Sequence, residues 1–346
     1  MRAFAPGRVN LIGEHTDYNE GLALAFAIAQ GVTVDAQAAA PGSGGEERVL
    51  AQALDLGERD EFALTDPPRA QGWRAFVRGT VAELTRAGLR PPGASLQIGG
   101  DIPRGAGLSS SAALEVSLSL ALLALAGAER EIGRTELAKL CSRVENDWAG
   151  AQTGLLDQLT SLYGQADMAM RIDFRTLAVE PVPLRLDGWR LATLDSGERR
   201  ENASSGYNRR RAECAHACAL LGVSSLRDAD VQHVERLPPP LRARARHVLG
   251  DNERVDRAVT ALSAGDLPAL GELLNESHVS LREDFEISTP HVEETVARML
   301  QAGAAGARLL GGGYGGSVLG LLPPDAAIPP GAREVRPCAG ARLLEG

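Results

Sequence analysis

The alternation of apolar and polar residues predicts strands in two parts of the chain. It runs through "VTVDAQA" at residues 32–38 and through "MAMRIDF" at residues 168–174. Because successive side chains of a strand point to opposite faces, this pattern predicts strands with one buried and one solvated face. A third stretch, "ASLQI" at residues 94–98, predicts a strand that runs into a glycine-rich loop.

Apolar residues at helical spacing predict helices elsewhere. The pattern is clear in residues 73–88, where Gly88 is a natural stop. In "TELAKLCSRVENDW" at residues 135–148 the apolar residues share one face, and Glu145 lies at its edge, from where it could reach into a site. Thr289 followed by Pro290 predicts the N-cap and first turn of another helix.

The mixture of strands and helices predicts a fold that contains both α and β structure. A chain of 346 residues has room for two domains, since domains average about 150 residues. Pro181 and Pro183 suggest a boundary near residues 180–188.

Composition narrows the classes of partner. The net charge of −9 argues against a nucleic-acid surface, which needs a basic patch. The longest apolar segment, residues 112–126, contains Glu115 and is too short to cross a bilayer, and the first residues carry no apolar signal core. We therefore expect a cytoplasmic protein with no nucleic-acid or membrane partner.

The four cysteines lack the spacing of a metal finger, which predicts free thiols in a reducing compartment. They are Cys141, Cys214, Cys218 and Cys338.

A candidate anion site lies in "GDIPRGAGLSSSAALEV" at residues 100–116. Gly105 and Gly107 would let the backbone approach a ligand closely, and the three serines at residues 109–111 stand where an apolar helix begins. A helix N-terminus offers unpaired N–H groups and the positive end of its dipole. A serine that merely caps the helix explains the same letters, whereas a dinucleotide fingerprint would need glycine in place of Ser110.

A P-loop is excluded because its pattern needs a lysine, and the only lysine of the chain, Lys139, lies elsewhere. Phosphate chemistry in this chain would therefore rely on backbone N–H groups, serine hydroxyls, arginine and a metal ion.

Two further glycine-rich stretches stand near the two ends of the chain. "GRVNLIGEHTDYNEG" at residues 7–21 gathers many ionisable groups between glycines, which fits either a solvated loop or a site. "GARLLGGGYGGSVLGLL" at residues 306–322 predicts strand, turn and strand, with more glycines around Tyr314 than a hairpin requires. Close backbone approach to a ligand and a flexible hairpin both explain the second stretch.

Taken in order, the three glycine stretches resemble the motifs of the GHMP kinases, and the first is similar to the signature of the galactokinases within that family. "GLLDQLTSLYG", "SSGYNRRRAEC" and "ESHVSLREDFEISTP" resemble further blocks of the same family. The resemblance implies an α+β, two-domain GHMP kinase fold. It implies an N-terminal domain like ribosomal protein S5 domain 2 at residues 1–185, and a ferredoxin-like C-terminal domain at residues 186–346.

The resemblance also implies roles for individual residues. Asp157 matches the catalytic aspartate, a general base, and Arg8 matches the arginine beside it, which would stabilise charge on the transferred phosphoryl group. Ser111 and Glu145 match the Mg²⁺ ligands, since a hydroxyl and a carboxylate supply the hard oxygens this ion prefers. The implied substrate-binding residues are Glu14, His15, Thr16, Asp17, Gly154 and Tyr207. The implied ATP-binding residues are Gly105, Ala106, Gly107, Leu108, Ser109, Ser110 and Ser111.

The implied activity is phosphorylation of the C1 hydroxyl of α-D-galactose by ATP, with Mg²⁺, which is the first committed step of galactose use. An N-acetylgalactosamine kinase and a non-catalytic galactose sensor of the same fold are the alternatives. Trp73 fits either packing beside adenine or an ordinary core position. Thr153, Leu310 and Tyr314 depart from the usual family letters, which bears on fine specificity. We expect galactose and ATP as partners and a monomer or weak homo-oligomer.

Overall fold

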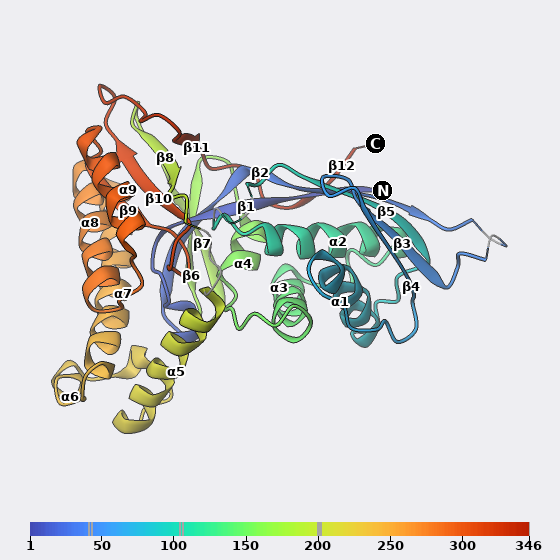
Figure 1. Cartoon of the computed structure of the whole chain (residues 1–346), viewed down its shortest axis with the longest axis horizontal. Coiled ribbons are helices and arrows are strands. Elements are labelled where there is room, and N and C mark those ends of the chain that lie inside the picture. Colours follow the sequence, from blue (N-terminus) through green and yellow to red (C-terminus); the bar gives the residue numbers. More distant parts are fainter. Residues whose placement is uncertain (41, 43, 104, 106, 199–202, 346) are drawn as a thin grey trace.

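Two β-sheets with helices packed against them make up the chain in a computed structural model (Figure 1). The structure describes residues 1–346 except residues 41, 43, 104, 106, 199–202 and 346, and it does not describe the side chains of residues 203–205. None of the described helices is long and apolar enough to cross a membrane. The four cysteines are free thiols, as predicted.

The first sheet is built around a long hairpin near the N-terminus. Its strand order is β12-β1-β2-β5-β3-β4, with β6 paired to β2 and β7 paired to β6, and every pair is antiparallel except β3 with β5. The strands are β1 (Arg2–Ile12), β2 (Leu22–Ala38), β3 (Arg48–Ala53), β4 (Glu58–Ala63), β5 (Ala94–Gly100), β6 (Met168–Asp173), β7 (Ala178–Pro183) and β12 (Arg342–Leu344). The three strands predicted from the sequence are confirmed as parts of β2, β5 and β6.

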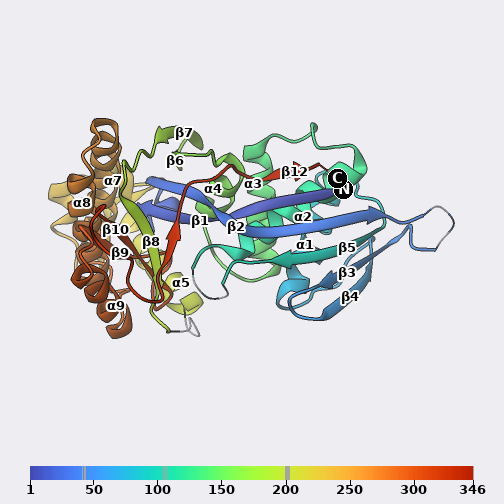
Figure 2. The same cartoon turned by 90° about the horizontal axis from the view of Figure 1, so that it is seen from above.

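Helices cover one face of this sheet (Figures 1 and 2). Its other face is solvated along β3 and β5, whereas both faces are buried along most of β1 and the first half of β2. The covering helices are α1 (Trp73–Arg86), α2 (Ser110–Ala126), α3 (Arg134–Arg143) and α4 (Leu156–Tyr163). Side chains of β3 and β5 alternate between buried and exposed, because only one face of each strand meets a helix. The helix α2 is apolar all round and almost wholly buried, since the sheet and its neighbouring helices enclose it.

The second sheet has the order β11-β8-β10-β9 and is antiparallel throughout. Its strands are β8 (Arg190–Asp195), β9 (Gly306–Leu309), β10 (Ser317–Leu322) and β11 (Arg333–Val335). The helices of this part of the chain are α5 (Ala203–Leu221), α6 (Val231–Val234), α7 (Leu241–Ala264), α8 (Leu267–Glu283) and α9 (Pro290–Gln301). The helices α7 and α8 stand side by side at one end of the molecule (Figure 1).

The predicted helices are confirmed with one difference. Trp73 begins α1, and the Thr289 side chain accepts from the backbone of Val292 at the start of α9. The helix expected over residues 135–148 ends at Arg143 and continues as a π-helical turn, Val144–Trp148. Such turns often occur at functional sites, and this one carries Glu145.

The chain passes from the first sheet to the second between β7 and β8, and its last strand, β12, returns to pair with β1. We retain the division into residues 1–185 and 186–346 as a proposal.

Candidate active site

A bulge in β1 places Arg8 inside the molecule. The register of β1 against β2 shifts between Pro6 and Arg8, and the Arg8 backbone N–H donates to the Leu108 carbonyl at 3.1 Å. A Cβ on Gly7 would come within 2.5 Å of that carbonyl oxygen, so glycine lets the loop before α2 lie directly on the strand. The first and second glycine stretches of the sequence therefore touch.

The guanidinium of Arg8 is held by two acceptors. Its Nε donates to Asp157 Oδ1 at 2.7 Å, its Nη2 lies 2.6 Å from the same oxygen, and its Nη1 donates to the Gly107 carbonyl at 2.7 Å. The other oxygen of Asp157, Oδ2, accepts a short hydrogen bond from the Ser109 hydroxyl. Ser109 occupies the N-cap of α2 without capping it, because its side chain is turned to Asp157.

The loop after β1 carries the other ionisable groups of the first glycine stretch. Glu14 and His15 are buried, Asp17 is half-buried, and His15 has a left-handed backbone with φ of 61°. The pKa of Asp17 is raised to about 6 because burial removes water from its carboxylate. Thr16 differs from its neighbours, since its hydroxyl donates to the carbonyls of Gly13 and Leu22 beneath the loop.

Helix α7 of the second part of the chain anchors this loop. The Glu14 backbone N–H donates to Asp251 Oδ2 at 3.1 Å, and the Glu14 carbonyl lies 3.0 Å from His247 Nε2. At the far end of the loop the Leu22 N–H donates to Asn252 Oδ1 at 2.8 Å. The loop is thus fixed by residues more than two hundred positions away in the chain.

Aromatic rings line the side of the loop that faces α5. The ring of His15 lies 4.9 Å from that of Tyr207 and 4.8 Å from that of Phe285, centroid to centroid. Gly154 comes so close to Asp17 that a Cβ would overlap its carboxylate. Tyr207 and Gly154 therefore lie next to His15 and Asp17, with which the sequence analysis grouped them as substrate-binding residues.

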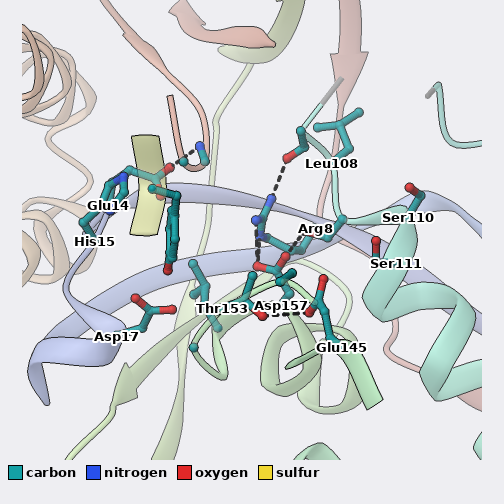
Figure 3. A pocket seen from close by; sticks show the side chains of 18 of the residues that line it. Arg8, Glu14, His15, Asp17, Leu108, Ser110, Ser111, Glu145, Thr153 and Asp157 are labelled. Carbon is teal, nitrogen blue, oxygen red and sulfur yellow. Dashed lines mark hydrogen bonds and ion pairs between the residues drawn. The ribbon is translucent and has the colours of Figure 1, made fainter. Parts of the chain in front are cut away.

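These groups line one cavity of about 290 Å³, just below the usual range for small-molecule sites. Figure 3 shows Glu14, His15 and Asp17 on one side of the Arg8–Asp157 pair and Ser110, Ser111 and Glu145 on the other. Every described residue that the sequence assigned to the site lines this cavity except Thr16, and Ala106 lies outside the described residues.

Backbone geometry shapes the loop before α2. Gly105, Gly107 and Ser109 all have positive φ, of 76°, 75° and 62°, and glycine adopts this conformation at little cost. The N-terminus of α2 consequently opens on the cavity, where its N–H groups and dipole favour an anion.

Glu145 is a buried carboxylate at the floor of the cavity. Its Oε2 accepts from Thr153 Oγ1 at 2.9 Å and from Gln158 Nε2 at 2.8 Å. Burial, with the nearby Asp157 charge, raises the pKa of Glu145 to about 7. A cation beside this group would relieve the cost of its charge.

A second, mostly apolar cavity of about 560 Å³ adjoins the serines on the opposite side from the loop. Val32, Phe76, Ile98 and Leu114 line it together with Trp73, and Ser110 and Ser111 line both cavities. Trp73 is half-buried and donates from its indole N–H to Glu58 at 2.8 Å. It lines this cavity and also packs against the edge of the hydrophobic core.

Comparison with known proteins relates the chain to one family along most of its length. Residues 1–38 match the galactokinase galactose-binding signature, residues 75–165 the GHMP kinases N terminal domain, and residues 258–336 the GHMP kinases C terminal domain. The chain is 43% identical to a galactokinase of Roseiflexus sp. over 92% of its own length and 82% of that protein's. It is 43% identical to a galactokinase of Mycobacterium bovis over 93% and 89%.

The chain belongs to the galactokinases of the GHMP kinase family. The solved structure of Lactococcus lactis galactokinase complexed with galactose superposes with a TM-score of 0.91 at 31% identity, covering 99% of this chain and 95% of that one. Mevalonate kinase of Methanococcus jannaschii shares the fold alone, with a TM-score of 0.67 at 17% identity, covering 98% of each chain. The predicted α+β GHMP kinase fold is confirmed.

Several residues of this galactokinase site were missed from the sequence. His247 and Asp251 are four residues apart on α7, a spacing that places both on one helix face and is a usable signal. Arg308 carries charge in the apolar strand β9, which is also a signal. Phe285 and Gln158 give no sequence signal, because an aromatic residue is ordinary in a core and a glutamine is ordinary on a helix surface.

Proposed function

We propose that this protein transfers the γ-phosphoryl group of ATP to the C1 hydroxyl of α-D-galactose, giving galactose 1-phosphate and ADP. One observation carries the proposal: the Arg8–Asp157 pair lies between the Glu14–Asp17 loop and the N-terminus of α2, in a single cavity. The names of its relatives, and galactose in the solved relative, support the choice of sugar.

The loop after β1 binds the sugar in this account. Carboxylates suit a polyhydroxylated ring because each oxygen can accept from a hydroxyl. Glu14 and Asp17 supply two of them, with Tyr207 and Gly154 closing the same part of the cavity. Thr16 shapes the loop and does not bind the sugar itself, since its hydroxyl contacts the backbone carbonyls of Gly13 and Leu22.

Asp157 removes the proton of the attacking hydroxyl. Its Oδ2 already accepts from one hydroxyl, that of Ser109, so an O–H donor of the sugar can be received at the same oxygen. Arg8 holds Oδ1 and thereby orients the carboxylate. The guanidinium, held between Asp157 and the loop before α2, would also stabilise the negative charge that develops on the transferred group.

The loop before α2 binds the phosphates of ATP. Its backbone N–H groups, the helix dipole and the hydroxyls of Ser110 and Ser111 replace the lysine that a P-loop would use. The apolar cavity beside these serines, with Trp73 in its wall, receives the adenine base.

Ser111 and Glu145 fit Mg²⁺. Both line the cavity next to Asp157, and both offer the oxygen atoms that this ion prefers. The raised pKa of Glu145 is the structural reason to expect a cation there, since a neighbouring positive charge stabilises the ionised form. When bound, Mg²⁺ neutralises charge on the phosphates of ATP.

A non-catalytic sensor is disfavoured because the serine loop and Asp157 are both present and joined by a hydrogen bond. We expect the protein to act in the cytoplasm as a monomer or weak homo-oligomer.

The test is ADP release with Mg-ATP and a panel of galactose, N-acetylgalactosamine, glucose, mevalonate and homoserine. We expect turnover with galactose well above that with every other acceptor. Preference for N-acetylgalactosamine would favour the alternative kinase, and no turnover with galactose would overturn the proposal.

A further inference from the structure

Arg308 is a charged side chain without any exposed surface. It lies on β9, is 0% exposed, and is among the largest fully buried side chains of the described residues. Burying an arginine is costly unless its charge and its donors are matched. The acceptors near its Nη1 and Nη2 indicate what it does, whereas its Nε has no hydrogen-bond partner among the described residues.

The guanidinium of Arg308 reaches from the second sheet to the first. Its Nη1 donates to the carbonyls of Asn10, at 3.3 Å, and Leu11, at 2.8 Å, both on β1. Its Nη2 forms an ion pair with Glu14 Oε1 at 3.2 Å. The same side chain therefore contacts the end of β1 and the first carboxylate of the loop that follows.

Glu14 receives a second contact from the same stretch of chain. Its Oε1 also accepts from the backbone N–H of Gly311 at 2.7 Å, and Gly311 opens the third glycine stretch directly after β9. Both contacts are made to Oε1, so they fix the plane of the carboxylate while Oε2 can accept from a ligand. The third glycine stretch thus contributes to the sugar side of the cavity.

The charges around Glu14 give Arg308 a specific task. Asp251, which accepts from the Glu14 N–H, forms an ion pair with Arg254 at 3.0 Å and has Arg308 as a second cationic neighbour. Burial lowers the pKa of His247, which disfavours a positive charge on the imidazole beside the Glu14 carbonyl. Among the described residues, Arg308 is the ion-pair partner of the Glu14 carboxylate.

We propose that Arg308 is a positioning residue for sugar recognition, which holds the Glu14 carboxylate turned toward a hydroxyl of bound galactose. The inference rests on the proposed function and names a determinant of sugar affinity on β9, outside the loop that contacts the sugar. Arg308 makes no contact with the Arg8–Asp157 pair in the described structure, so its effect should fall on galactose and spare ATP.

A double-mutant cycle tests this link. Galactose Kd would be measured without nucleotide for the wild type, Arg308→Gln, Glu14→Gln and the double variant. We expect Arg308→Gln to weaken galactose binding roughly tenfold or more, and to add little in the Glu14→Gln background, because coupled residues are not additive. Arg308→Lys should restore part of the affinity by returning the charge. KM for ATP should stay within about twofold in each single variant.

Arg171→Gln is the matched control. Arg171 is a partly buried arginine on β6 that pairs with Asp256 of α7 at 2.9 Å and so also joins the two parts of the chain, away from the cavity and from the loop after β1. It should leave galactose Kd unchanged.

Equal effects of Arg308→Gln and Arg171→Gln on galactose Kd, or additive effects of Arg308→Gln and Glu14→Gln, would overturn the inference. If Arg308→Gln does not fold, the cycle is run with Arg308→Lys, which keeps the buried charge and changes only its geometry. A wild-type protein that does not bind galactose overturns the proposed function instead, so the two failures are distinguishable.

Discussion

Glu145 is a carboxylate whose surroundings oppose its charge. Its pKa is raised to about 7 by burial and by the nearby Asp157, and Asp17, across the cavity, has its pKa raised to about 6 for similar reasons. With Glu14, four carboxylates thus face one cavity that also contains Arg8. The ligand-free site is less stable than an uncharged one would be, and binding of a cation reverses this cost.

Replacing Glu145 by glutamine should therefore stabilise the ligand-free protein. The folded-state pKa lies above the unfolded value, so the wild type loses stability as pH rises from about 4.5 to about 7. Glutamine does not titrate and can keep acceptor contacts with Thr153 and Gln158. We expect Glu145→Gln to be about 1–3 kcal/mol more stable than the wild type at pH 8, with the difference vanishing near pH 4.5.

Denaturant unfolding without ligand at both pH values measures this difference. The same variant should require much more Mg²⁺ for half-maximal rate. A Glu145→Gln protein that is less stable at pH 8, or that shows unchanged Mg²⁺ dependence, would remove Glu145 from the cation site.

Asp157→Asn tests the base. Asparagine keeps the size of the side chain and an acceptor for Arg8 but does not take a proton. We expect kcat to fall roughly 10²- to 10⁴-fold, while galactose Kd changes little because the sugar is held mainly by the loop after β1. Calorimetry and steady-state kinetics on one preparation check both. Turnover near the wild-type rate would exclude Asp157 as the base.

At the scale of elements, the site depends on places where two segments meet without a side chain between them. Gly7 of β1 lies against the Leu108 carbonyl of the loop before α2, and Gly154 lies against the Asp17 carboxylate. Gly7 lies on the ATP side of the Arg8–Asp157 pair, and Gly154 lies on the galactose side. Adding one methyl group should therefore disturb one substrate more than the other.

We predict that Gly7→Ala raises KM for ATP and that Gly154→Ala raises KM for galactose, each roughly tenfold or more, since overpacking displaces the neighbouring segment. Gly133→Ala is the control, because a Cβ at this N-cap of α3 meets no atom within 4 Å. Initial-rate kinetics with both substrates varied would decide. If each variant raises both KM values equally, the two halves of the cavity are not separable.

The sequence predicts some of these elements well and others poorly, for physical reasons. Helix α1 and the strand in residues 32–38 can be predicted from periodicity, because burial of one face determines which positions of each element are apolar. The π-helical turn at Val144–Trp148 does not follow, because its apolar residues fit an ordinary α-helix equally well, and Glu145 on this turn bonds to Thr153 and Gln158 outside the helix. The described site residues recognised by motif line one cavity, apart from Thr16. The supports from α7 and β9 leave a weaker signal, because an acidic residue beside a histidine on one helix face, or an arginine in an apolar strand, does not show which distant loop it contacts.

At the scale of the whole molecule, the cavity lies where the two parts of the chain meet. The loop after β1 is anchored by α7, and Arg308 of β9 reaches the end of β1. A hydrophobic cluster also continues from the first sheet into α7 and α8. Substrate binding should consequently depend on how the two parts of the chain pack against each other. For this reason a buried arginine on β9 can change the affinity for galactose.

The most direct test of the central claim is the position of the phosphoryl group in the product. Galactose labelled with ¹³C at C1 would be incubated with the wild-type protein and Mg-ATP, and the product observed by ³¹P and ¹³C NMR. We predict that one new phosphate ester appears, with ³¹P coupled to the labelled anomeric carbon in the α configuration, and that ADP forms in equal amount. A phosphate on any other carbon, or ADP formed without a sugar phosphate, would contradict the account.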